Sequence, residues 1–141
     1  NIHFYTVWRK NFLNGKIRWI NRHDIIELKQ MDSSIKVIIG IGGKADFPDY
    51  VSIIPFEKIK YDPLIKKAKD QNKIPYYIVR FMGDVWFSWN LEEINKKREL
   101  KWRTMSLPKT SKFYRNDNVD KLVADLYLDE ASPLDLNWRY E

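Results

Sequence analysis

Residues 36–43 read KVIIGIGG, and the segment before them, residues 22–30, reads RHDIIELKQ. Each holds a short apolar run typical of a strand, and the polar residues 31–34 between them are typical of a turn. The sequence therefore predicts a β-hairpin whose first strand carries one acid, Asp24, near its start. Gly40 and Gly42 fall on one face of the second strand, because side chains alternate along a strand. That face has either lost catalytic side chains or packs closely against a neighbouring element.

Composition limits the class of protein. The chain has 141 residues, of which 44% are hydrophobic, and this is enough for one compact domain with its own core. It has no cysteine, which excludes a disulfide framework, a thiolate metal site and a cysteine nucleophile. Its longest apolar runs are far shorter than the roughly 20 residues that cross a bilayer, so we expect no membrane partner. A chain without cysteine is compatible with a reducing compartment, and we expect an intracellular location, in the cytoplasm or the nucleoid.

The charge balance favours a polyanionic partner. Lysine and arginine number 25 against 19 acidic residues, which gives a net charge of +6 and a sequence pI of about 9.4. Binding to nucleic acid is the usual use of such a charge, because each neutralised phosphate releases counterions. Aromatic and basic residues also stand side by side, as in Lys101-Trp102-Arg103. Such pairs either stack a base beside a phosphate or cover the edge of the core.

The predicted elements alternate between helix and strand. Their order is helix 1–14, strand 16–20, the two hairpin strands, loop 44–49, strand 50–54 stopped by Pro55, helix 64–72, strands 74–81 and 85–89, helix 90–103, loop 106–116 and helix 119–130. We expect strand 74–81 to be central, and we expect Asn90 to cap the helix that follows it. This order predicts an α/β fold with a mixed central sheet flanked by helices. Residues 1–105 would form the α/β core, and residues 106–141 would form a C-terminal arm and helix packing on the same domain.

The predicted helix 64–72 has two distinct faces. Its apolar face holds Leu64, Ile65 and Ala68. Its other face, with the residue that follows the helix, holds Lys66, Lys67, Lys69 and Lys73. This second face is either a solvated lysine surface or a rim that contacts phosphate.

Residues 24–89 resemble the core of the PD-(D/E)XK, or restriction-endonuclease-like, superfamily, and within it archaeal Holliday-junction resolvases. The similarity lies in the order and spacing of DIIELKQ at 24–30, KVIIGIGGKADFPDYVSIIPFEKI at 36–59, LIKKAKDQNK at 64–73 and IPYYIVRFMGDVWFSW at 74–89. The resemblance covers about half the chain. It implies a restriction-endonuclease-like sheet, a DNA substrate and a homodimer.

The same resemblance implies a metal-dependent mechanism. In the family, two carboxylates hold a divalent cation that polarises the scissile phosphate, and a lysine helps to position water. Asp24 matches the first carboxylate and would be the metal ligand. Gly40 and Gly42 stand where the family's Glu-x-Lys pair is expected, and glycine supplies neither a ligand nor a proton carrier. The resemblance therefore implies a nuclease-like fold that has lost its catalysis, and whether the chain is an enzyme stays open.

Substitutes for the missing pair stay open. Glu27 and Lys29 form a literal Glu-x-Lys, but on the same strand as Asp24. Lys44 follows the glycines closely, and Glu57 lies on a predicted helical turn after Pro55. The catalytic candidates are thus Asp24, Glu57 and Lys44, with Mg²⁺ as the cofactor if the chain is active and none otherwise. Glu57 could also bind a cation together with Asp46 and Asp49.

Three functions follow from these observations. The first is a catalytically degenerate nucleic-acid-binding domain of a DNA-processing or nucleoprotein system. The second is an active Mg²⁺-dependent endonuclease or junction resolvase that uses displaced residues, and the third is a docking subunit that binds a protein partner. The predicted nucleic-acid contacts are Arg18, Arg22, Lys29, Lys44, Lys60, Arg103, Lys112 and Arg115.

Overall fold

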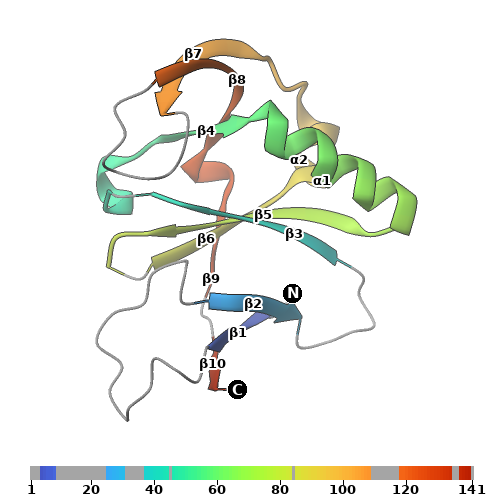
Figure 1. Cartoon of the computed structure of the whole chain (residues 1–141), viewed down its shortest axis with the longest axis vertical. Helices are drawn as coiled ribbons and strands as arrows, with labels where there is room; N and C mark the ends of the chain where they lie inside the picture. The colour runs from blue at the N-terminus through green and yellow to red at the C-terminus, as the bar shows by residue number, and fades with distance from the viewer. Residues whose placement is uncertain are drawn as a thin grey trace.

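The computed structural model describes residues 4–8, 25–30, 37–44, 46–83, 85–108, 118–134 and 137–140. These residues form an α/β fold with two α-helices and three sheets (Figure 1). The helices are α1 (Lys58–Gln71) and α2 (Leu91–Lys97). The strands are β1 (Phe4–Trp8), β2 (Ile25–Gln30), β3 (Val37–Gly43), β4 (Ile53–Glu57), β5 (Ile74–Phe81), β6 (Val85–Asn90), β7 (Arg103–Pro108), β8 (Asn118–Tyr127), β9 (Ser132–Leu134) and β10 (Asn137–Tyr140). Short 3₁₀ helices span Pro48–Tyr50 and Leu128–Glu130.

The central sheet has the strand order β3-β5-β6-β9 and is mixed, because β3 runs parallel to β5 while β6 runs antiparallel to it. The predicted central strand is confirmed as β5, in which Ile78, Val79 and Phe81 are fully or almost fully buried. A turn at residues 82–83 leads from β5 into β6. Gly83 has a φ of 81° there, a backbone conformation that glycine adopts at little cost.

The outer sheet, β4-β8-β7, corrects the prediction of a helix over residues 119–130. That segment is the middle strand β8, which pairs with β4 on one side and with β7 on the other. Val123, Ala124 and Leu126 are fully buried in it. Two neighbouring strands satisfy its backbone groups, and aspartate and valine are weak helix formers, so tertiary pairing overrides the helical spacing.

Two further boundaries differ from the predictions around the outer sheet. The strand predicted at 50–54 is β4 instead, and Pro55 lies inside it; β4 is an edge strand, where proline removes no needed donor. The helix predicted over 90–103 ends at Lys97, and residues 103–108 form β7 rather than part of that helix and a loop. Arg98 ends α2 because it is extended and donates hydrogen bonds to Glu130 and to the Asp125 carbonyl.

The predicted hairpin of residues 22–43 is wrong. β2 pairs antiparallel with β1 in the terminal sheet, β10-β1-β2, whereas β3 pairs with β5. The helix predicted over residues 1–14 is also wrong within the described residues, because β1 is a strand held between β2 and β10. Its sequence, FYTVW, is rich in β-branched and aromatic residues that favour a sheet. The strand predicted at 16–20 lies outside the described residues.

The core lies between the central and outer sheets and is closed by the two helices. Phe56 of β4, Tyr77 of β5 and Trp89 of β6 are buried there, and Phe56 stacks on Tyr77 with ring centroids 4.0 Å apart. The helix predicted from Leu64 begins earlier, at Lys58, and Pro63 lies inside it at the cost of one hydrogen bond. Neither α1 nor α2, the helices of the described part of the chain, has the length and apolar composition needed to cross a membrane.

Candidate nucleic-acid interface

The structure describes the side chains of four predicted site residues, Lys44, Glu57, Lys60 and Arg103. Lys29 lies on β2 opposite Tyr5 of β1, and nothing is described of its side chain. The other predicted residues, Asp24, Arg18, Arg22, Lys112 and Arg115, lie outside the described residues.

Glu57 ends β4 and precedes α1, rather than lying on the predicted helical turn. Its carboxylate oxygens lie 2.6 Å from the Lys121 ammonium and 3.1 Å from that of Lys60. Burial alone would raise the pKa of Glu57, but hydrogen bonds and charges from Lys121 and Lys60 outweigh burial and lower that pKa. Glu57 is therefore an ionised carboxylate already neutralised by two lysines, and it ties α1 to β8.

These surroundings do not suit a magnesium ligand, because two ammonium groups within 3.1 Å of the carboxylate oxygens would repel a divalent cation bound there. The proposed cation trio of Asp46, Asp49 and Glu57 is not assembled either. Among the described residues, no three acidic or histidine side chains come together in a group that could hold a metal ion.

The two other predicted cations with described side chains, Arg103 and Lys44, are also neutralised in part. The Arg103 guanidinium lies 2.9 Å from the Asp125 carboxylate, and the Lys44 ammonium lies 3.9 Å from that of Asp46. Trp102 packs against Tyr61 with ring centroids 5.1 Å apart, and the Lys58 ammonium lies 5.0 Å from its ring. This tryptophan covers the edge of the core and is therefore not an open base-stacking platform, although Lys101 and Arg103 beside it are exposed.

Gly40 and Gly42 make room for Tyr77. A Cβ atom at position 42 would clash with the Tyr77 hydroxyl oxygen and would lie 2.8 Å from its Cζ. At position 40 a Cβ atom would lie 3.2 Å from Leu64 Cδ2 and 3.4 Å from Tyr77 Cδ1. The glycines therefore serve close packing, in which the Tyr77 ring covers the face of β3 where the family's Glu-x-Lys pair was expected.

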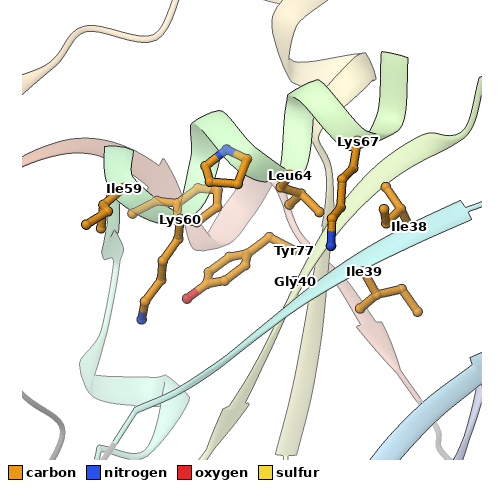
Figure 2. A pocket seen from close by; sticks show the side chains of 10 residues that line it. Ile38, Ile39, Gly40, Ile59, Lys60, Leu64, Lys67 and Tyr77 are labelled. Carbon is orange, nitrogen blue, oxygen red and sulfur yellow. The ribbon is translucent and has the colours of Figure 1, made fainter. Parts of the chain in front are cut away.

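A groove of about 350 Å³ runs between α1 and β3 (Figure 2). Its lining is mainly apolar and includes Ile59, Pro63 and Leu64 from α1. Figure 2 shows Lys60 and Lys67 extending from α1 on either side of the Tyr77 ring. The groove thus combines an apolar centre with Lys67 at one end, which forms no ion pair within the described residues, and with Lys60 at the other end, whose charge is shared with Glu57.

Four lysines without an ion pair among the described residues lie on the C-terminal half of α1 and just past its end at Gln71. The lysine face, defined as Lys66, Lys67, Lys69 and Lys73, forms no ion pair within the described residues. By contrast, Lys58 at the other end of α1 pairs with Asp62 at 2.8 Å. The spacing of the lysines in the sequence indicated this face, but only the structure shows that its charges are not neutralised.

Sequence reasoning does not find Lys121 as a partner of Glu57, because helical spacing predicts a helix over residues 119–130. A strand interpretation would have placed Lys121 and Val123 on one face, with Val123 opposite Glu57 in the register. Comparisons of the chain with protein-family models, curated proteins and solved structures find no match.

Proposed function

We propose that this chain is a nucleic-acid-binding domain that contacts phosphates through the lysine face of α1 and does not cleave them. The observation that carries the proposal is the set of four lysines without an ion-pair partner in the described residues, on a protein with a net charge of +6. Lys66, Lys67 and Lys69 are exposed, so their ammonium groups are free to release counterions on binding.

The spacing of these lysines suits a phosphate backbone. Lys66 and Lys69 are three residues apart on α1, a rise of about 4.5 Å, and Lys73 follows the helix, which ends at Gln71. Phosphates of one DNA strand follow one another every ~3.4 Å along the duplex axis, so flexible lysines at this spacing can reach several of them. Asp70 is the acidic residue among them, which leaves an excess of three positive charges on residues 66–73.

The restriction-endonuclease-like origin is part of the same proposal. The chain order β3, β4, α1, β5, β6 supports it, although β2 pairs with β1 and not with β3, and β4 lies in the outer sheet. Two features support the absence of cleavage. Gly40 and Gly42 have no side chain that could bind a metal ion, and the Glu57 carboxylate is paired with Lys60 and Lys121. Incubation of supercoiled and junction DNA with Mg²⁺ or Mn²⁺ tests this part, and product with either ion would overturn it.

Salt-dependent binding tests the proposal itself. The variant Lys66→Ala, Lys69→Ala, Lys73→Ala should weaken binding of a fluorescent duplex and reduce the slope of log K against log salt by up to about 2.7, since each phosphate contact contributes ~0.9. The matched control is Lys96→Ala, Lys97→Ala, Lys101→Ala, which removes the same charge from exposed positions elsewhere.

The control variant should keep the wild-type slope within error. Equal losses in the two variants would show a general charge effect and would refute a defined site on α1. Undetectable binding of the wild-type protein to duplex, junction and single-stranded DNA at low salt would refute the proposed function as a whole.

A further inference from the structure

The edge of β3 is open to a further strand. β3 is the edge strand of the central sheet, and no described strand pairs with its outer side. The Lys44 N–H donates to the Arg80 carbonyl at 2.9 Å. Because the direction of the backbone N–H and C=O groups alternates along a strand, the even-numbered residues of β3 direct these groups toward β5. Val37, Ile39, Ile41 and Gly43 therefore direct their N–H and C=O groups away from β5.

Within the part of the chain that the structure describes, this edge lacks the features that protect sheet edges. Residues 37–43 contain no proline and no charge, and their pairing with β5 has no bulge. An edge of this kind is a template for strand addition. The polar backbone groups of four residues are thus presented in one row.

The groove between α1 and β3 lies along the same edge. Figure 2 shows the side chain of Ile38 on the α1 side of β3 and that of Ile39 on the opposite side. A strand added beside β3 would likewise place alternate side chains on the α1 side, next to Ile59, Pro63 and Leu64. Ile59 is 76% exposed, so part of this apolar lining has no cover among the described residues.

We propose that the groove binds an extended segment of a partner protein, which adds to β3 as a strand and carries an acidic-x-apolar-x-acidic pattern. Lys60 and Lys67 are seven residues apart on α1, a rise of about 10 Å. Side chains at the first and fifth positions of a strand are about 13 Å apart, a distance that lysine side chains can bridge. The apolar residue at the third position then contacts Pro63 and Leu64.

Charge complementarity selects this occupant over a second copy of the chain. A second β3 strand would bring only apolar residues and glycine to the groove, and Lys67 would stay without an acidic partner. Strand addition by a partner segment supplies both backbone hydrogen bonds and carboxylates. The proposal goes beyond nucleic-acid binding, because it uses the β3 edge and Lys67 and does not need Lys66, Lys69 or Lys73.

Fluorescence anisotropy with synthetic peptides tests the proposal on the full chain. The probe is a labelled peptide containing Glu-Thr-Leu-Thr-Glu, and its partner probe contains Lys-Thr-Leu-Thr-Lys. We expect the acidic peptide to bind and the basic peptide to bind at least about tenfold more weakly, because charge reversal opposes both lysines. Two N-methylated forms of the acidic peptide, one modified at the odd and one at the even positions, test the backbone hydrogen bonds. The form that loses the N–H groups facing β3 should bind about tenfold more weakly, and the other form should bind about as well as the unmodified peptide, because only one set of N–H groups faces β3.

A pair of adjacent lysines provides the protein variants. Lys67→Glu should weaken the acidic peptide about tenfold, whereas Lys66→Glu, which makes the same charge change outside the groove lining, should weaken it much less. Both positions are exposed on α1, so neither substitution disturbs the core.

Four results would overturn the proposal. The first is no binding of the acidic peptide at about 1 mM, a limit that corresponds to roughly −4 kcal/mol. The second and third are equal effects of the two N-methylated peptides and equal effects of the two lysine variants. The fourth is a wild-type dimer in sedimentation that the acidic peptide does not dissociate. The variant Lys66→Ala, Lys69→Ala, Lys73→Ala separates the two proposals. It should lose DNA binding and keep peptide binding, so either function can fail without the other.

Discussion

Substitution of Gly42 by alanine measures how tightly Tyr77 closes the α1 face of β3. The new Cβ atom would meet the Tyr77 hydroxyl oxygen and would lie 2.8 Å from Cζ. The ring is 6% exposed and stacked on Phe56, so it cannot swing into solvent without losing core contacts. Overpacking of this kind costs about 1–3 kcal/mol.

The neighbouring glycine provides the matched control. A Cβ atom at Gly40 would lie 3.2 Å from a methyl group of Leu64, which requires a shift of only a few tenths of an ångström. Replacement of glycine by alanine also restricts the unfolded chain and contributes about 0.4–1 kcal/mol of stability. We therefore expect Gly42→Ala to lower the free energy of unfolding by about 1–2 kcal/mol and Gly40→Ala to change it by less than about 1 kcal/mol.

Urea denaturation followed by tryptophan fluorescence measures these free energies. A double-mutant cycle with Tyr77→Phe removes the hydroxyl oxygen that the new Cβ atom meets, and it should recover part of the loss because the contact with Cζ remains. Equal stabilities of the Gly42→Ala and wild-type proteins would refute the close packing of Tyr77 over β3. Zero coupling with Tyr77→Phe would refute the hydroxyl as the point of contact.

Three further changes test the contacts that hold the outer sheet and α2. The hydrogen bond from Arg98 lowers the pKa of Glu130 in the folded protein below its ordinary value of 4.5. The unfolded chain therefore binds a proton at Glu130 more readily as the pH falls below 4.5. The stability that this carboxylate contributes above pH 4.5 is lost below that pH. Glu130→Gln should reduce this acid-dependent decline in the urea midpoint, and an unchanged pH profile would contradict the ion pair. Trp89→Phe leaves the Tyr127 carbonyl without the indole N–H at 2.9 Å and should cost about 2 kcal/mol in the same assay; a cost below about 0.5 kcal/mol would argue against this bond. Asn90→Ala removes the side-chain cap of α2 and should cost about 1 kcal/mol, with an unchanged urea midpoint as the contrary result.

Local sequence was sufficient where neighbouring residues supply the partners. The strand IPYYIVRF and the cap at Asn90 follow from the sequence, because each depends on residues within a few positions along the chain. The apolar face of α1, with Leu64 and Ala68 buried, follows from helical periodicity in the same way.

Long-range pairing determined the rest. Residues 119–127 have helical spacing, yet β4 and β7 satisfy their backbone groups from both sides, and β4 lies about 70 positions earlier in the chain. The apolar runs of β2 and β3 look like a hairpin, but each finds a partner elsewhere, β1 for one and β5 for the other.

The properties of the candidate site also come partly from the sequence and partly from the tertiary structure. The sequence by itself determined the excess of positive charge, the lysines of residues 66–73 and the absence of side chains at positions 40 and 42. Only the tertiary structure decided which charges are neutralised, because Lys121 and Asp125 of β8 reach Glu57 and Arg103 from distant parts of the chain. It also placed Tyr77 over the glycines, since a ring on a neighbouring strand fills space that the sequence shows only as two missing side chains.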